Sequence, residues 1–487
     1  MSSCCSAQPR RENRGPEEAR SALGGLPVVV VGGGPVGLAA AAHLLERGLD
    51  PVVLEAGPSA GTAPLSWSHV PMFSPWRYNI DRAARALLER HGWAAPDEDA
   101  FPTGRELVEG YLAPLAALPE MAGRLRVGTR VTGVARLRAG KVRDAGREEQ
   151  PFEVRFSDAR GTEGRILARA VVVATGTWGS PGPAGASGLP AIGEREAADR
   201  IRHGMPDVLG ADRDRYAGRR TMVVGSGHSA VSTLLDLAAL AGQAPGTSVL
   251  WAARSADLSR AYGGGAADQL PERGALGQRL RRLVDTRVVE LLAPFFVYEI
   301  RRGADASLLV TSAEGGSAEA DEMVVATGLR PDLSILREVR LDLDPVLECP
   351  RPLAPLIDPN LHSCGTVRPH GAKELAQPDA GLFLAGMTSY GRAPTFLLAT
   401  GHEQVRSVAA FLAGDLEAAR RVELDLPETG VCNTDRTLPA DEGAASACCA
   451  SVPSRNACCA PEPAPAKESS WPGSAASHAP AQVEPAE

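Results

Sequence analysis

The chain has 487 residues, of which 44% are hydrophobic, so it is long enough to form two or three domains with buried cores. Its formal net charge is -8 and no dense cluster of Lys or Arg occurs, which argues against nucleic acid as a partner. We find neither a signal peptide nor an apolar run that would span a membrane, so we expect a cytoplasmic protein whose nine cysteines are thiols.

Two terminal segments, 1–26 and 427–487, are rich in Pro, Ala, Ser, Glu and Gly and poor in large apolar residues, so we expect them to be disordered tails. Between them, short runs of β-branched residues alternate with longer Ala- and Leu-rich stretches. The runs are PVVVVGGG, DPVVLEAG, RAVVVATG, RTMVVGSG, TSVLWAAR and DEMVVATG. This alternation predicts an α/β fold with parallel sheets and crossover helices.

The first of these units, PVVVVGGGPVGLAAAAHLLERGLDPVVLEAG, contains Gly32, Gly34 and Gly37 as a G-x-G-x-x-G motif. The three glycines allow a tight turn, close approach of the backbone to a pyrophosphate, and close contact between helix and strand. The amides at the helix N-terminus would then face the phosphates. A second strand ends in Glu55, whose carboxylate can accept hydrogen bonds from a ribose. The unit predicts a dinucleotide site.

A second unit, RTMVVGSGHSAVSTLLDLAAL, repeats the pattern with Gly225, Gly227 and Ala230. Its following strand, TSVLWAAR, ends in Arg254, which can pair with a 2'-phosphate. The arginine therefore favours NADPH over NADH, although a solvated charge at a strand end is the alternative.

Chain order suggests that the second unit is inserted into the first. We expect two nested Rossmann-like dinucleotide-binding domains with a small helical insert and disordered tails. The expected segments are 27–215 for the first domain with the helical insert at about 58–124, 216–322 for the second domain, and 323–415 for the rest of the first.

Two Ala-Thr-Gly turns, a GLFLAGM segment at 381–387 and a helix beginning near Thr395 complete a fixed order of motifs. This order, over about 27–412, resembles the two-dinucleotide-binding-domain flavoproteins that include thioredoxin reductases and flavin-containing monooxygenases. The resemblance implies FAD on the first unit and NADPH on the second. The residues expected at these cofactors are Gly32, Gly33, Gly34, Pro35, Gly37, Glu55, Thr175, Gly176, Gly225, Ser226, Gly227, His228, Ser229, Ala230, Arg254, Thr327, Gly328, Gly386, Met387 and Thr395.

Disulfide reductases of this group carry a Cys-x-x-Cys or Cys-x4-Cys pair beside the flavin, and this sequence has none. The resemblance therefore favours the monooxygenase branch. His203 in RIRHGMPDVLG partly matches the motif that precedes the NADPH strand in that branch, and a surface histidine is the alternative. His69 and Arg77, in the aromatic segment WSHVPMFSPWRYN, are further catalytic candidates. That segment either walls the flavin pocket or forms the core of the insert.

Paired cysteines, Cys448 with Cys449 and Cys458 with Cys459, lie in the C-terminal tail. Adjacent α-carbons are ~3.8 Å apart, below the ~4.4 Å usual for a disulfide, so neighbours do not readily bond to each other. Vicinal thiolates do chelate soft ions. The scheme is similar to that of mercuric reductases, and the chain resembles flavoproteins associated with arsenic resistance. The tail thus predicts capture of a soft metal or metalloid; adventitious binding and disulfides between the pairs stay as alternatives.

We therefore expect an FAD- and NADPH-dependent oxidoreductase, monooxygenase-like toward a soft nucleophile or metalloid. One alternative is a reductase of a disulfide or thiol-bound metalloid that acts through the tail. Another is a metal-binding or redox-sensing flavoprotein without turnover. The expected partner is a small-molecule or metalloid substrate, with neither nucleic acid nor membrane.

Overall fold

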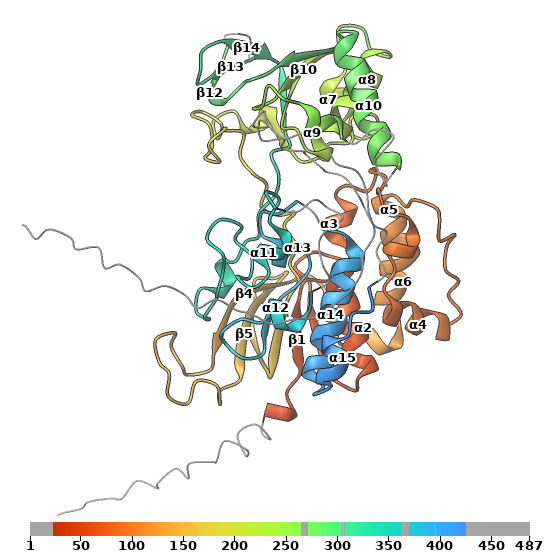
Figure 1. Ribbon diagram of the computed structural model, residues 1–487, viewed down its shortest axis with the longest axis vertical. Helices are drawn as coiled ribbons and strands as arrows, with labels where there is room; N and C mark the ends of the chain where they lie inside the picture. Colours follow the sequence, from red (N-terminus) through yellow and green to blue (C-terminus); the bar gives the residue numbers. More distant parts are fainter. Residues whose placement is uncertain are drawn as a thin grey trace, which may run out of the picture. The chain divides into compact units, whose positions relative to one another are not determined.

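The computed structural model describes residues 23–263, 271–303, 305, 307–361, 370–394 and 396–424. The tails expected at 1–26 and 427–487 lie outside these residues, except for 23–26. The described chain contains two five-stranded parallel sheets and two smaller antiparallel sheets (Figure 1).

The first parallel sheet has the strand order β16-β7-β1-β2-β3. Every residue of β1, β2, β7 and β16 is buried, which explains why these strands read as continuous apolar runs without alternation. Its strands are β1 (Val28–Val31), β2 (Pro51–Leu54), β3 (Leu125–Arg126), β7 (Ala170–Val173) and β16 (Leu382–Leu384).

Two long helices cover this sheet, α2 (Pro35–Glu46) and α14 (Leu398–Leu412), and they pack side by side (Figure 1). Alanines at 39–42 are buried in α2 and allow the close contact. The helix expected near Thr395 begins at Leu398, and Thr395 itself lies outside the described residues.

Short helices fill the segment between β2 and β3. They are α3 (Thr62–Leu65), η1 (Trp76–Tyr78), α4 (Arg82–Arg90), α5 (Gly104–Leu107), the π-helix η2 (Val108–Leu112), α6 (Ala113–Ala116) and η3 (Pro119–Met121). Trp76, Tyr111 and Leu112 are buried in the same core as α2. The aromatic segment 67–79 therefore contributes Trp76 to this core, and the π-helix η2 contributes Tyr111 and Leu112.

The second parallel sheet has the order β11-β10-β9-β15-β8 and carries α8 (His228–Ala241) and α10 (Pro271–Asp285). Trp251 in β10 is fully buried, and its indole N–H donates to the Gly225 carbonyl at 2.7 Å. The strands are β8 (Ile201–His203), β9 (Arg220–Val224), β10 (Ser248–Ala252), β11 (Val289–Leu292) and β15 (Glu322–Val325).

The two antiparallel sheets each have three strands. One consists of β4 (Thr129–Arg136), β5 (Phe152–Asp158) and β6 (Glu163–Ala168), and the other of β12 (Val297–Arg302), β13 (Leu308–Ser312) and β14 (Ser317–Ala320). The remaining helices are η4 (Ala198–Arg200), α7 (Arg213–Tyr216), α9 (Ser259–Tyr262), η6 (Ser334–Leu336), α11 (Ala354–Ile357), α12 (Ala372–Leu375), α13 (Met387–Tyr390) and α15 (Leu416–Arg420).

The α/β class with Rossmann-like units is confirmed, and all six apolar runs are strands. The boundaries drawn at 216 and 322 differ from the extent of the second sheet. Strand β15 pairs with β9 and with β8, so residues 201–203 and 322–325 both belong to that sheet. The difference arises because β8 has only three residues, too few to give a recognisable pattern in the sequence.

Candidate functional site: two glycine turns at helix N-termini

The first glycine turn connects β1 to α2. Gly32 has φ +110°, and a side chain there would also collide with the Ala174 carbonyl. A side chain on Gly37 would collide with the carbonyl of Gly32. By contrast, no described atom lies within 4 Å of a Cβ placed on Gly34. Two glycines are therefore required by packing, while Gly34 leaves a space that the protein itself does not fill.

The N-terminus of α2 is suited to a bound anion. Gly34 is the N-cap and forms no side-chain cap, and Pro35 stands in the first turn. Uncapped amides and the helix dipole together favour a phosphate at this position. The Glu55 carboxylate accepts from the amides of Gly33 at 2.6 Å and Gly57 at 2.7 Å. It keeps acceptor capacity for a ribose hydroxyl, so the residues present fit FAD.

The Ala-Thr-Gly turn after β7 is tied to α13. Gly176 has φ +67°, and its amide donates to the Thr388 hydroxyl at 2.9 Å. The Thr175 and Thr388 hydroxyl oxygens are 3.2 Å apart. Sequence reasoning missed Thr388. Its position directly after the GLFLAGM segment, which ends at Met387, was a usable signal.

The turn at Gly386 is held by a second residue that sequence reasoning missed. The Gly386 amide donates to Gln404 Oε1 at 2.7 Å, which fixes the orientation of that amide side chain. Gln404 Nε2 lies 2.9 Å from Ser389 Oγ and 2.8 Å from His370 Nε2. Gln404 belongs to α14 and is fully buried, so these hydrogen bonds join that helix to the turn that precedes Met387.

The second glycine turn repeats the geometry of the first. Gly225 has φ +131°, and a side chain there would collide with the Ala326 carbonyl. Gly227, the N-cap of α8, has no side-chain cap, and a Cβ placed on it would have no described atom within 4 Å. Ala230 is fully buried at the close-packing position. This turn therefore offers a second uncapped helix N-terminus with the same open face, which suits a phosphate.

Residues around the second turn come from several segments. Ser226 lies in the turn, and His228 and Ser229 begin α8, where the His228 ring lies 5.1 Å from the Phe73 ring. Gly328 has φ +99°, and the Thr327 hydroxyl donates to the Pro183 carbonyl at 2.9 Å. Arg254 is exposed after β10, and its Nη1 donates to the Ala186 carbonyl at 3.1 Å.

The three catalytic candidates do not form a constellation. His203 is exposed at the end of β8, and Arg77 is exposed and ion-paired with Asp99. His69 Nε2 is buried without a hydrogen-bond partner. Within the described chain, no hydrogen bond, ion pair or ring contact joins these three side chains.

Cysteine chemistry in the described residues is limited to Cys349, which is buried and unpaired. Burial and nearby carboxylates raise the pKa of its thiol to about 12, so it is not a reactive thiolate. Thr395, Cys448, Cys449, Cys458 and Cys459 lie outside the described residues. Over the described ranges, no group of three or more His, Cys, Asp or Glu could hold a metal, and no helix is both long and apolar enough to cross a membrane.

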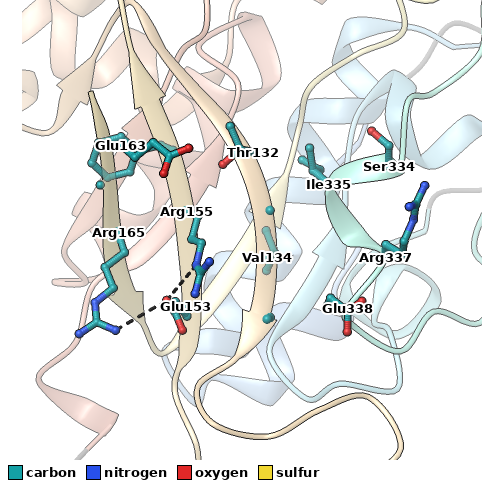
Figure 2. Close-up of a pocket in the computed structure, with 14 residues that line it drawn as sticks. Thr132, Val134, Glu153, Arg155, Glu163, Arg165, Ser334, Ile335, Arg337 and Glu338 are labelled. Atoms are coloured by element: carbon teal, nitrogen blue, oxygen red, sulfur yellow. Dashed lines mark hydrogen bonds and ion pairs between the residues drawn. The ribbon is translucent and has the colours of Figure 1, made fainter. Parts of the chain in front are cut away.

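A cavity of about 920 Å³ lies over the sheet β4-β5-β6 and faces the segment 334–338 (Figure 2). On this sheet, Glu153 pairs with Arg155 and Arg165 (Figure 2). None of the predicted cofactor or catalytic residues lines it. The cavity is therefore separate from both glycine turns.

Comparison with protein-family models assigns most of the chain to one family. Residues 26–349 match the family model of pyridine nucleotide-disulphide oxidoreductases. The chain is 29% identical over 215 residues to indole-3-pyruvate monooxygenase YUCCA1 of Oryza sativa subsp. japonica, a match that covers 43% of this chain and 44% of that relative.

Solved structures show the same fold. The bacillithiol disulfide reductase Bdr (YpdA) of Bacillus cereus aligns with a TM-score of 0.59 and 20% identity, covering 80% of this chain and 99% of that one. DfoA of Erwinia amylovora, a cadaverine monooxygenase bound to FAD, aligns with a TM-score of 0.57 and 18% identity, covering 82% and 97%. The chain thus belongs to the pyridine nucleotide-disulphide oxidoreductase family, and its two Rossmann-like domains have the fold of these solved structures.

Proposed function

We propose that this protein is an NADPH-dependent flavin monooxygenase that acts on a soft nucleophile or a metalloid. The observation that carries the proposal is the duplication of an open, uncapped helix N-terminus at Gly34 and Gly227. Each is a phosphate cradle, and two cradles in one chain suit one bound flavin and one nicotinamide donor.

The first cradle would hold FAD and the second NADPH. The amides at the start of α2 and the Glu55 carboxylate would bind the pyrophosphate and ribose of FAD, which supplies a two-electron acceptor when bound. The amides at the start of α8 would bind the NADPH pyrophosphate, and Arg254 would pair with its 2'-phosphate. The Thr388 and Gln404 hydrogen bonds would keep the Gly176 and Gly386 turns in place beside the flavin.

The cysteine content favours O₂ over a disulfide as the acceptor of electrons from the flavin. The sequence has no Cys-x-x-Cys or Cys-x4-Cys pair, and the described Cys349 is buried and protonated. In the proposed reaction, NADPH gives two electrons, one oxygen atom of O₂ goes to the substrate, and the other leaves as water with one proton from NADPH and one from solvent. Monooxygenases are among both the sequence relatives and the structural neighbours, which supports this choice.

Flavin spectroscopy tests the proposal. The FAD-loaded protein is mixed with NADPH under anaerobic conditions, and we expect the visible absorbance of the flavin to bleach. On admission of air, we expect a transient spectrum that matches neither oxidised nor reduced FAD. Immediate return of the oxidised spectrum would contradict monooxygenation, and failure to bleach would contradict the use of NADPH.

A second candidate function is reduction of a disulfide or thiol-bound metalloid through the C-terminal cysteines. The specific observation in its favour is the recurrence of adjacent cysteines, at Cys448 with Cys449 and at Cys458 with Cys459. Vicinal thiolates bind soft metalloids well, which also makes an arsenic-related role and a cytoplasmic location reasonable proposals.

A further inference from the structure

Two guanidinium groups lie near each other beside the backbone of Gly188. This glycine has φ +82°, and a Cβ built on it would lie 2.9 Å from Arg330 Nη2 and 4.0 Å from Arg392 Nη2. Apart from the adjacent chain, no other described atom lies within 4 Å of that point. The absence of a side chain at Gly188 therefore lets Arg330 lie close to the backbone, and it leaves the two Nη2 atoms near enough to each other for one small anion to bridge them.

The positive charge at this point is poorly compensated. No carboxylate oxygen in the described chain lies within 4.0 Å of the Arg330 guanidinium. Arg392 has Glu348 Oε1 at 3.8 Å, but these side chains are 44% and 38% exposed, so the pair is weak. An anion at Gly188 would gain charge-assisted hydrogen bonds from two planar guanidinium groups.

Backbone hydrogen bonds fix the positions of both arginines. The Arg330 amide donates to the Ser180 carbonyl at 3.0 Å, directly after the second Ala-Thr-Gly turn. The Arg392 amide donates to the Leu347 carbonyl at 2.7 Å, two residues after the end of α13. Arg330 thus follows a turn that the sequence predicts beside a dinucleotide, and Arg392 lies in the loop after α13, the helix that begins at the predicted residue Met387.

We propose that Arg330 and Arg392 form an anion subsite at Gly188, which binds a carboxylate, phosphate or other oxyanion of the substrate. That the anion belongs to a substrate rests on the proposed function, and the subsite would then require a substrate with a negatively charged group. Anion binding itself requires no turnover. The nucleotide is the competing source of such an anion, because Arg254 contacts the same loop at Ala186.

Arginine labelling on the FAD-loaded full-length protein tests the subsite. Phenylglyoxal modifies accessible guanidinium groups, and peptide mass spectrometry reports each arginine separately. With inorganic phosphate as the probe, we expect labelling of Arg330 and Arg392 to slow about fivefold or more, because both groups would then be engaged. Arg301, which is 68% exposed on β12, is the matched control and should label at an unchanged rate.

Saturating NADP⁺ distinguishes the two sources of anion. We expect protection of Arg330 and Arg392 by phosphate to persist when NADP⁺ is bound. If NADP⁺ alone protects both arginines and phosphate adds nothing, the anion is a phosphate of the nucleotide and the substrate subsite is wrong. Equal labelling with and without phosphate would also overturn it.

Substitutions at Gly188 and Arg330 provide an independent check of the anion subsite. Gly188→Asp places a carboxylate between the guanidinium groups, and Asp tolerates positive φ better than most residues. We expect this variant to show slow labelling of both arginines without phosphate, whereas Gly188→Asn should still require phosphate. In Arg330→Gln, protection of Arg392 should be lost; its retention would contradict a shared site. These results do not depend on bleaching by NADPH, so failure of the proposed function is recognised separately.

Discussion

At the scale of single residues, one buried charge pair joins α2 to the start of α4. His43 in α2 lies with Nε2 2.8 Å from Asp81 Oδ2, the N-cap of α4, and both are at least 98% buried. Burial disfavours the charged imidazolium, but the Asp81 and Glu46 carboxylates together outweigh it and raise the pKa of His43 to about 9. Burial lowers the pKa of the neighbouring His402 to about 4, so that ring stays neutral.

This pair predicts a specific dependence of stability on pH. The folded pKa of His43 lies above its ordinary 6.5, so its stabilisation is fully present below pH 6.5 and is lost as the pH rises through 9. The loss corresponds to about 3 kcal/mol. We expect the urea midpoint of the wild type to fall between pH 6.5 and 9, and His43→Gln to lack most of that fall.

His91 supplies the matched control, because it also pairs with a carboxylate, at 3.0 Å from Glu120, but is exposed. His91→Gln should follow the wild-type pH profile. Parallel profiles for His43→Gln and the wild type would show that the His43–Asp81 pair does not control this range.

At the scale of elements, each of the two strand-turn-helix units contains glycine that packing requires and a glycine beside open space. Gly34→Ala meets no described atom within 4 Å, so the cost to folding should be only about 1 kcal/mol, the usual cost of alanine at an N-cap. We expect its bound FAD after gel filtration to fall about tenfold, because the methyl group displaces the pyrophosphate from the amides. Gly227→Ala should instead weaken NADPH binding and leave the FAD content unchanged.

Gly133→Ala in β4 is the control, since no described atom lies within 4 Å of its Cβ position either and it belongs to neither cradle. It should retain both cofactors. If Gly34→Ala also retains FAD at the wild-type ratio of visible to ultraviolet absorbance, the first turn does not hold the cofactor.

At the scale of the whole molecule, the tail cysteines and the cofactor units can be separated by experiment. We expect replacement of Cys448, Cys449, Cys458 and Cys459 by Ser to lower the amount of trivalent arsenical bound, measured by native mass spectrometry, because only the adjacent pair Cys4 and Cys5 then remains. Oxidation of NADPH without substrate should be unchanged. Cys432 has no adjacent cysteine in the sequence, so the control variant Cys432→Ser should bind the arsenical as the wild type does. A quadruple variant that binds as much arsenical as the wild type would contradict capture by the C-terminal pairs.

Much of the fold was predictable because its signals are local. A buried strand, a glycine turn and an Ala-rich helix are contiguous in the chain, so Gly32 to Gly37 and Gly225 to Ala230 were recognisable without any tertiary contact. The site was predicted less completely. Thr388 and Gln404 meet their partners only through the packing of α13 and α14, and His203, Arg77 and His69 share no contact that the structure describes.

The sequence by itself therefore determined the class of the fold, with two Rossmann-like units. It also determined that a positive charge, Arg254, follows the second strand of the second unit, and that no Cys-x-x-Cys pair occurs. Only the tertiary structure decided which separated residues meet. It brought His43 to Asp81, Arg330 and Arg392 to Gly188, and β8 to β15. The physical reason is that backbone turns are encoded by neighbouring residues, whereas burial and charge compensation depend on contacts between elements far apart in the chain.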